Sequence, residues 1–251
     1  MALLCIIYFF GNTVPPKKNS AAAVKTGRDS SFNIDNVLQA SRAQLTPGQQ
    51  TRVTQLENSV VRGDVKEQQA KIYTQLATFY KDTAHLLLPF AYYTGQAAKL
   101  ENSEKSLTFA ARFFLESART QRDEGLKNWM ASESKELFEK ALILNPGNDS
   151  LKVGLGSCYI YGNIAGPMQG IMMIREVAER DPNNMYAQYM LGVGGLMSGQ
   201  LDRAIERLSL VASKQPGNVE VKLMLAEAYE RKGDKPNAVK WDEAVKEQVN
   251  N

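Results

Sequence analysis

The residue types that most often carry chemistry in proteins are sparse in this chain. The 251 residues include one histidine, His85, and two cysteines, Cys5 and Cys158, which lie far apart in sequence. A tetrahedral metal site needs several such ligands close together, and a nucleophile needs an oriented base. Neither arrangement can be assembled from these residues, and two dispersed cysteines exclude a disulfide framework. We therefore predict no metal site, no cofactor and no catalytic residue.

Sequence motifs for nucleotide or acyl-transfer chemistry are also missing. We find no P-loop of the form GxxxxGK[ST], no dinucleotide glycine fingerprint and no Ser-His-Asp or Cys-His arrangement. Carboxylates alone could serve a glycosidase, but helical surfaces carry many glutamates for solvation, so their presence does not discriminate. The sequence therefore favours a protein that is not an enzyme.

An aromatic group at Phe90, Tyr92 and Tyr93 is the strongest candidate for stacking on a ligand. Such groups more often belong to a hydrophobic core, and we interpret this one as core. His85 receives the same interpretation, because no nucleophile or orienting partner lies near it in sequence. Pro89, directly before the aromatic group, either starts a helix or kinks one.

The elements that carry these residues come from a chain of ordinary globular composition. Hydrophobic residues make up 43% and charged residues 23%, so the bulk of the chain is expected to fold. The net charge of +3 comes from residues 1–45, which contain five basic residues and two aspartates. In the remaining residues, positive and negative charges are equal in number. The lack of excess positive charge in this larger part of the chain argues against nucleic-acid binding, which needs clustered lysine and arginine.

Residues 1–14 begin with ten apolar, uncharged residues, MALLCIIYFF. About 20 apolar residues are needed to cross a bilayer, so the run is too short for a complete transmembrane helix. The pattern favours a truncated membrane anchor, and a buried docking segment is the alternative. Residues 15–31, rich in Pro, Ser, Ala and Lys, are interpreted as a flexible linker. On this basis we expect a single-pass location in a bacterial inner membrane, with the side of the soluble body open.

Helical periodicity begins at Phe32 and continues to the C-terminus, with the clearest pattern in residues 182–245. Thr46 is expected to cap a helix that has Pro47 in its first turn. Gly-polar turns at Ser198-Gly199-Gln200 and Lys232-Gly233-Asp234 separate apolar stripes. Five positions recur after 34 residues: Leu191 and Leu225, Gly192 and Ala226, Gly199 and Gly233, Ala204 and Ala238, Pro182 and Pro216.

This 34-residue spacing resembles the tetratricopeptide repeat (TPR), a helix-turn-helix unit. The resemblance implies an all-α fold, a right-handed α-solenoid of TPR-type hairpins with degenerate N-terminal hairpins. It places TPR-like hairpins in residues 32–145 and three TPR units in residues 146–251. The unit that starts at Pro146 is two residues longer, and the extra residues fall in a Gly/Pro-rich turn at residues 161–167. Asp242 stands where Leu208 stands one repeat earlier, so we expect a loosely packed last helix.

In the TPR family the first helix of each unit lines the concave surface, where peptides or partner segments bind. Carried over by position, the resemblance implies a protein-binding face made of the following residues: Val153, Ser157, Ile160, Tyr186, Tyr189, Val193, Leu196, Leu223, Glu227 and Glu230. This face lacks the Lys/Arg clamp with which some TPR domains hold a C-terminal carboxylate, so we do not expect that mode.

The function that the sequence favours is a non-enzymatic scaffold for protein–protein interaction, tethered to the membrane by its N-terminus. The partner is a protein or peptide of unknown identity. Two alternatives stay open: a self-assembling structural subunit, in which Met185, Tyr189, Met190 and Met197 bury against a second copy, or an accessory subunit of a membrane enzyme complex.

Overall fold

The structure, a computed structural model, describes residues 32–62, 65–162, 164 and 166–249. In this part of the chain it contains helices and no strand. The helices are α2 (Ile34–Ala43), α3 (Pro47–Arg62), α4 (Lys66–Asp82), α5 (Leu87–Glu101), α6 (Glu104–Thr120), α7 (Glu124–Leu144), α8 (Asp149–Tyr161), α9 (Pro167–Arg180), α10 (Met185–Met197), α11 (Leu201–Lys214), α12 (Val219–Lys232) and α13 (Lys235–Val249).

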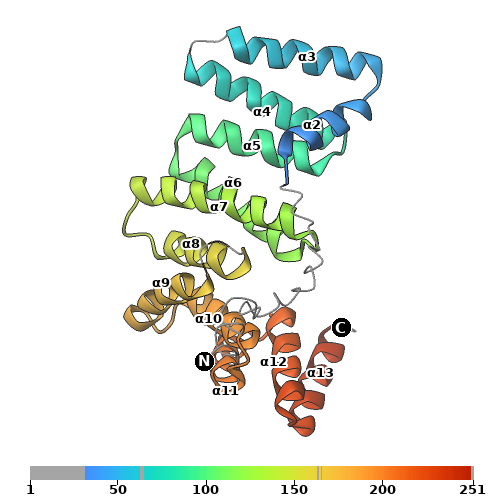
Figure 1. The fold of residues 1–251 in the computed structure, drawn as a ribbon. Helices are drawn as coiled ribbons and strands as arrows, with labels where there is room; N and C mark the ends of the chain where they lie inside the picture. The colour runs from blue at the N-terminus through green and yellow to red at the C-terminus, as the bar shows by residue number, and fades with distance from the viewer. Residues whose placement is uncertain (1–31, 63–64, 163, 165, 250–251) are drawn as a thin grey trace, which may run out of the picture. The chain divides into compact units, whose positions relative to one another are not determined.

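Antiparallel hairpins form the repeating unit, and they stack in chain order (Figure 1). The most extensive packing is between α4 and α5, α6 and α7, α8 and α9, α10 and α11, and α12 and α13. Each hairpin then packs on the next. The predicted all-α fold class is confirmed: this is an α-solenoid.

Each of the last three hairpins begins with the same capping device. The side chains of Asn148, Asn184 and Asn218 accept hydrogen bonds from the backbone N–H three residues further on, at 3.3, 3.0 and 3.1 Å. This bond satisfies one of the donors that a helix leaves unpaired at its N-terminus. The prolines and asparagines at the repeat boundaries therefore set where each first helix starts.

The predicted turns and the first cap are confirmed. Gly199 and Gly233 adopt positive φ angles of 74° and 84°, which glycine reaches without steric cost. At the start of α3, Thr46 Oγ1 accepts from Gln49 N while Gln49 Oε1 accepts from Thr46 N at 2.9 Å. This reciprocal capping box matches the predicted cap at Thr46.

Helix α4 contacts both of its neighbours in sequence, α3 and α5, but it packs most extensively on α5. Aromatic stacking joins these two helices: Tyr80 of α4 stacks on Tyr93 of α5 with ring centroids 5.6 Å apart. Tyr93 also donates a hydrogen bond to Glu57 Oε1 of α3 at 2.9 Å.

The aromatic group of α5 is largely core, as interpreted from the sequence, whereas His85 is not. Tyr93 is 5% exposed, and Phe90 and Tyr92 are half-buried. His85 is exposed in the turn after α4, with a φ of 55° and Nδ1 3.1 Å from the Lys81 carbonyl oxygen. It therefore belongs to a helix end, where a ring nitrogen can bond a free carbonyl group.

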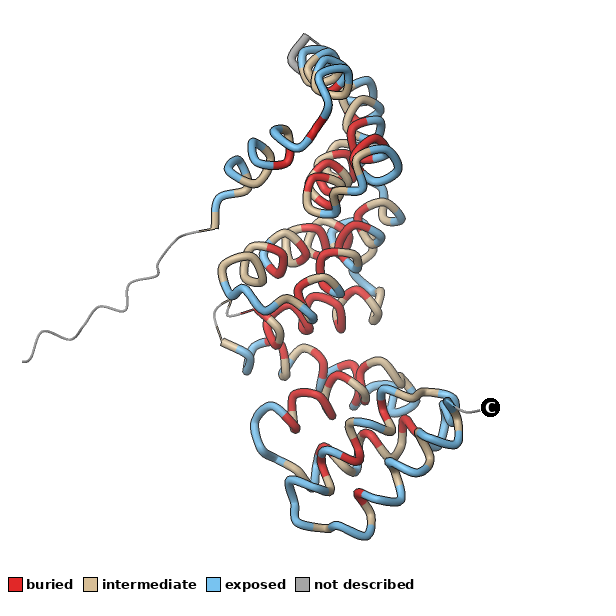
Figure 2. The backbone as a smooth tube through the Cα atoms, turned by 90° about the vertical axis from the view of Figure 1, so that its right-hand side faces the viewer, coloured by how far each residue is buried: buried red, intermediate tan, exposed pale blue. Residues whose placement is uncertain are grey.

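The hydrophobic core continues from hairpin to hairpin (Figure 2). Four clusters of buried side chains follow one another along the chain, spanning α2 to α5, α5 to α9, α8 to α10, and α10 to α13. Because no hairpin can bury its apolar side alone, each depends on its neighbour.

The last helix is loosely packed, as expected. In α13 only Ala238 is buried, and Asp242 is exposed where Leu208, one repeat earlier, has 0% of its surface exposed. No hairpin covers the outer side of α13 within the described residues, so a charged side chain is tolerated there.

The predicted single-pass location in a bacterial inner membrane is corrected. Across residues 32–62 and 65–249, apart from the gaps at 163 and 165, no helix is both long and apolar enough to span a bilayer. The segments on which the anchor and linker predictions fall, residues 1–14 and 15–31, lie outside the described residues.

The hairpin of α8 and α9 is held by direct contact between the two backbones. A Cβ built on Gly170 would lie only 2.2 Å from the carbonyl oxygen of Gly156. Such an overlap with backbone cannot be relieved by a side-chain rotation, so the helices would have to separate.

We expect Gly170→Ala to lower the free energy of unfolding by about 1–3 kcal/mol, because overpacking outweighs the better helix propensity of alanine. Urea unfolding followed by circular dichroism measures this change. Gly147→Ala is the matched control, since nothing lies within 4 Å of a Cβ built there. Equal stabilities of the two variants would contradict the tight contact.

Cys158 should behave as a buried core thiol. It is 0% exposed, its Sγ lies 3.2 Å from Ser134 Oγ, and burial raises its pKa to about 12. Because the thiolate is the reactive form, we expect a Cys5→Ser variant to react with a thiol reagent at least about 100-fold more slowly when folded than in urea. Rapid reaction of the folded variant at neutral pH would contradict this.

Candidate functional site

The first helices of successive hairpins come together on one side of the repeat array. Helix α6 contacts α8, and α8 contacts α10, although each pair is separated by a second helix in sequence. Residues on the open stripe of each first helix can therefore form one continuous surface. We call this surface the first-helix face; its members are Arg112, Glu116 and Arg119 of α6, Tyr161 of α8, Tyr186 and Tyr189 of α10, and Glu220 of α12.

Arg119 is the centre of the first-helix face. Its Nη1 lies 3.3 Å from the hydroxyl oxygen of Tyr189 and donates a hydrogen bond to Glu220, which is 101 residues away in sequence. Its Nε lies 3.1 Å from Glu116 Oε2, an ion pair without hydrogen-bond alignment. Burial alone would lower the pKa of Arg119, but Glu220 and Glu116 raise it overall. One guanidinium thus ties α6, α10 and α12 together.

Three tyrosines lie in the first-helix face, and two of them, Tyr161 and Tyr189, interact with Arg119. Burial raises the pKa of Tyr161 to about 12, with Arg119 acting against the shift. Burial also raises the pKa values of Tyr186 and Tyr189. A hydrogen bond with Ser157 acts in the opposite direction on Tyr186. All three phenols are therefore neutral hydrogen-bonding groups at physiological pH.

Half of the residues predicted for the protein-binding face are in the interior. Val153, Ser157, Ile160, Val193 and Leu196 have exposed fractions of 0, 0, 5, 5 and 5%. Neighbouring helices cover nearly all of their surfaces, so we leave them out of the candidate surface. Apolar side chains at these positions serve the packing between hairpins.

The other predicted residues lie at the surface. Tyr186 and Tyr189 are half-buried in the first-helix face. Leu223 is 49% exposed, and Glu227 and Glu230 are exposed beside it on α12. Their spacing of three and four residues continues the stripe that starts at Glu220. Glu227 also forms an ion pair with Arg231 at 3.1 Å.

Sequence reasoning missed the contribution of α6 and Tyr161. The signal was available: Phe109, Arg112, Glu116 and Arg119 recur at intervals of three and four residues along α6, which places them on one stripe. It was overlooked because α6 itself lacks the marker residues of the repeat's first helix. Phe109, with 59% of its surface exposed, stands at the N-terminal end of this stripe.

The side chains of the first-helix face resemble those of protein interfaces. It offers phenol groups, paired charges and, at its margins, exposed apolar side chains, a mixture common in protein interfaces. Among the described residues, no group of three or more His, Cys, Asp or Glu side chains is arranged to hold a metal ion. The methionines proposed for self-assembly are mostly covered: Met190 is 2% exposed and Met185 is half-buried, whereas Met197 is 60% exposed.

Stacked hairpins with a continuous first-helix face define a helical-repeat protein. Residues 195–251 match the family model described as tetratricopeptide repeat. The match is confined to the C-terminal part of the chain, which is therefore similar to this repeat family.

Solved structures with a similar fold include two of the protein MamA. The structure titled "MamA 41-end from Desulfovibrio magneticus RS-1" is 19% identical, has a TM-score of 0.51 and matches 75% of this chain and 97% of that one. The structure titled "Crystal structure of MamA protein" is 19% identical, with a TM-score of 0.48 over 71% of this chain and 91% of that one.

A third structure is that of YrrB, titled "a TPR protein with an unusual peptide-binding site". It is 19% identical, with a TM-score of 0.43 over 76% of this chain and 90% of that one. At these identities the likeness concerns the fold alone. A comparison with curated proteins finds no match.

Because the pKa of Tyr161 is raised in the folded chain, the stability of the fold decreases as the pH rises into the alkaline range. In the unfolded chain a tyrosine titrates near pH 10, so above that pH the unfolded state loses its proton first and is favoured. The contribution of the protonated Tyr161 phenol to the free energy of unfolding is fully present below about pH 10. It is lost as the pH approaches about 12.

The substitution Tyr161→Phe removes the phenol group whose proton titrates. Between about pH 9 and pH 11, we expect the variant to lose about 1 kcal/mol less stability than the parent chain. Urea unfolding at the two pH values measures the difference. Equal losses in both proteins would mean that Tyr161 titrates in the folded chain as it does in the unfolded one.

Proposed function

We propose that the chain is a scaffold for protein–protein interaction and that the first-helix face, extended along α12, docks a segment of a partner protein. The observation that carries the proposal is the exposed stripe on α12, where Leu223 has 49% of its surface exposed and lies beside Glu227 and Glu230. We take Leu223 together with the aromatic side chains of Tyr186 and Tyr189 as the contact area, because aromatic residues are enriched in protein interfaces.

The charges on this part of the face indicate the kind of segment it accepts. Glu220, Glu227 and Glu230 are all exposed on α12. Carboxylates around an apolar contact favour a partner segment that combines apolar with basic side chains, because opposite charges steer association and reject acidic competitors. Tyr189 supplies a large, rigid contact area that loses little entropy on binding.

Site-specific photocrosslinking tests the proposal in cells. A photoreactive amino acid at position 223 should yield one discrete adduct with another protein, because this position lies within the proposed contact. Replacing Glu227 and Glu230 together by lysine should reduce the yield about tenfold or more, because the charge complementarity would be reversed. Western blotting and mass spectrometry of the adduct provide the readout.

The matched control is the same photoreactive amino acid at Val239, which is 53% exposed on α13 and lies outside the proposed surface. Labelling from position 239 equal to that from 223 would refute the proposal. An adduct from position 223 of twice the chain's own mass would instead favour self-assembly, the alternative for which Met197 is still an exposed candidate.

A further inference from the structure

A recess lies between the hairpin of α8 and α9 and that of α10 and α11. It has a volume of about 500 Å³, within the range of about 300–1,000 Å³ that small-ligand sites occupy. Its base is α10, where Gly194 and Gly195 present no side chain to it. A Cβ on Gly194 would lie 2.4 Å from Ile171 Cδ1, so these glycines let the neighbouring helices close around the recess. This pocket shares no residue with the first-helix face.

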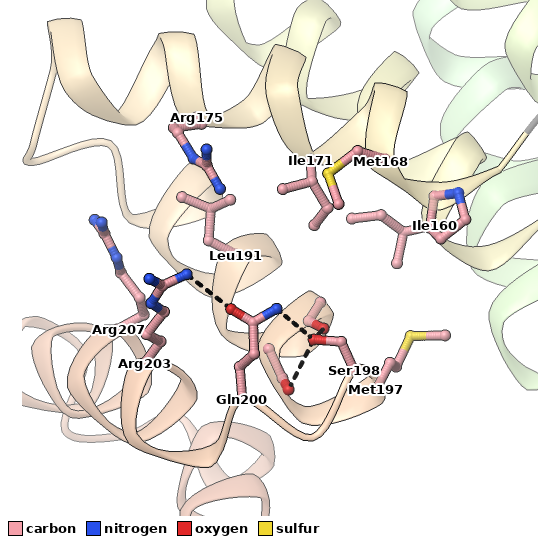
Figure 3. A pocket seen from close by; sticks show the side chains of 13 residues that line it. Ile160, Met168, Ile171, Arg175, Leu191, Met197, Ser198, Gln200, Arg203 and Arg207 are labelled. Carbon is pink, nitrogen blue, oxygen red and sulfur yellow. Dashed lines mark hydrogen bonds between the residues drawn. The ribbon is translucent and has the colours of Figure 1, made fainter.

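One end of the pocket is basic. Arg175 of α9 and Arg203 and Arg207 of α11 line this end around Leu191 (Figure 3). No carboxylate lines the pocket, and within the described residues none of the three arginines forms a salt bridge. Arg207 is held by a hydrogen bond from its Nη1 to Gln188 Oε1 at 2.6 Å. Guanidinium groups without a carboxylate partner favour an anionic ligand.

The opposite end is apolar. Ile160, Met168, Ile171 and Met197 line it and lie away from the arginines (Figure 3). Met168 and Met197 expose 63 and 60% of their surfaces. Flexible methionine side chains can adapt to an apolar group of varying length. A ligand that matches both ends of the pocket would have an anionic head and an apolar body.

Hydrogen bonding in the pocket distinguishes an acyl chain from a peptide. Ser198 Oγ donates to the Gly194 carbonyl oxygen at 2.8 Å and accepts from Gln200 Nε2 at 3.1 Å. Gln200 Oε1 accepts from Arg203 at 2.8 Å. The neutral polar side chains are thus already paired with one another, whereas each amide group of a bound peptide would need a hydrogen-bond partner. An acyl chain needs none.

We propose that this pocket binds a medium- or long-chain fatty acid as its carboxylate. The carboxylate lies among Arg175, Arg203 and Arg207, and the acyl chain lies between Met168 and Met197. This site is independent of the first-helix face, and either proposal can fail without the other.

Titration calorimetry of the full chain tests the proposal, with dodecanoate below its micelle concentration as the probe. We expect binding of one dodecanoate per chain, and at least about tenfold weaker binding of octanoate, because four methylene groups fewer are buried. Dodecyltrimethylammonium, with the same chain length and the opposite charge, should bind at least about tenfold more weakly.

Two pairs of variants locate the site. Met168→Glu should weaken dodecanoate binding at least about tenfold, whereas Met172→Glu should not, since both residues are 63% exposed on α9 but only Met168 lines the pocket. Arg175→Ser combined with Arg203→Ser should weaken binding to a similar degree. Arg122→Ser, at an exposed arginine outside the pocket, is its control. Circular dichroism confirms folding of every variant.

Several outcomes would overturn the proposal. These are no measurable binding of dodecanoate, equal binding of the trimethylammonium compound, or equal effects of Met168→Glu and Met172→Glu. Binding of a short acidic, leucine-rich peptide at the same arginines, with no binding of dodecanoate, would also overturn it in favour of a peptide site.

Discussion

Direct backbone contact within a hairpin is the constraint on which the rest of the structure depends. Gly156 and Gly170 allow α8 and α9 to touch, and Gly195 faces Ala204 in the next hairpin in the same way. With paired helices this close, the apolar side chains of a hairpin point outward to its neighbours, and stacking follows. The small residues thereby determine where the first-helix face and the pocket can form.

Helix α10 shows how one helix can serve two surfaces. Tyr186 and Tyr189 belong to the first-helix face, whereas Leu191, Gly194 and Gly195 line the pocket. Between them, Met190 and Val193 are buried in the core. Because a helix turns by about 100° per residue, neighbours in sequence reach opposite sides. The first-helix face and the pocket can therefore lie on the same helix without sharing a residue.

Much of the fold could be predicted from local signals. The caps at Asn148 and Thr46 and the turns at Gly199 and Gly233 depend on bonds within a few residues, and residue type alone indicates them. The 34-residue recurrence indicated hairpins of constant shape. The extensive packing of α4 on α5 was harder to predict, since it depends on tertiary contacts such as the stacking of Tyr80 on Tyr93.

The candidate site was only half predictable, because exposure is a property of neighbours. Val153 and Leu223 were assigned to the same stripe by position, but the first is buried and the second is half exposed. Val153 is covered by α9 and α10, whereas Leu223 lies on the last hairpin, beyond which no further repeat packs within the described chain. By itself, the sequence determined the helical period, the caps and the turns, since these need only short-range bonds. Tertiary structure alone decided which stripe positions reach solvent, and it brought Arg119 to Glu220 across 101 residues, because both depend on how separate hairpins stack.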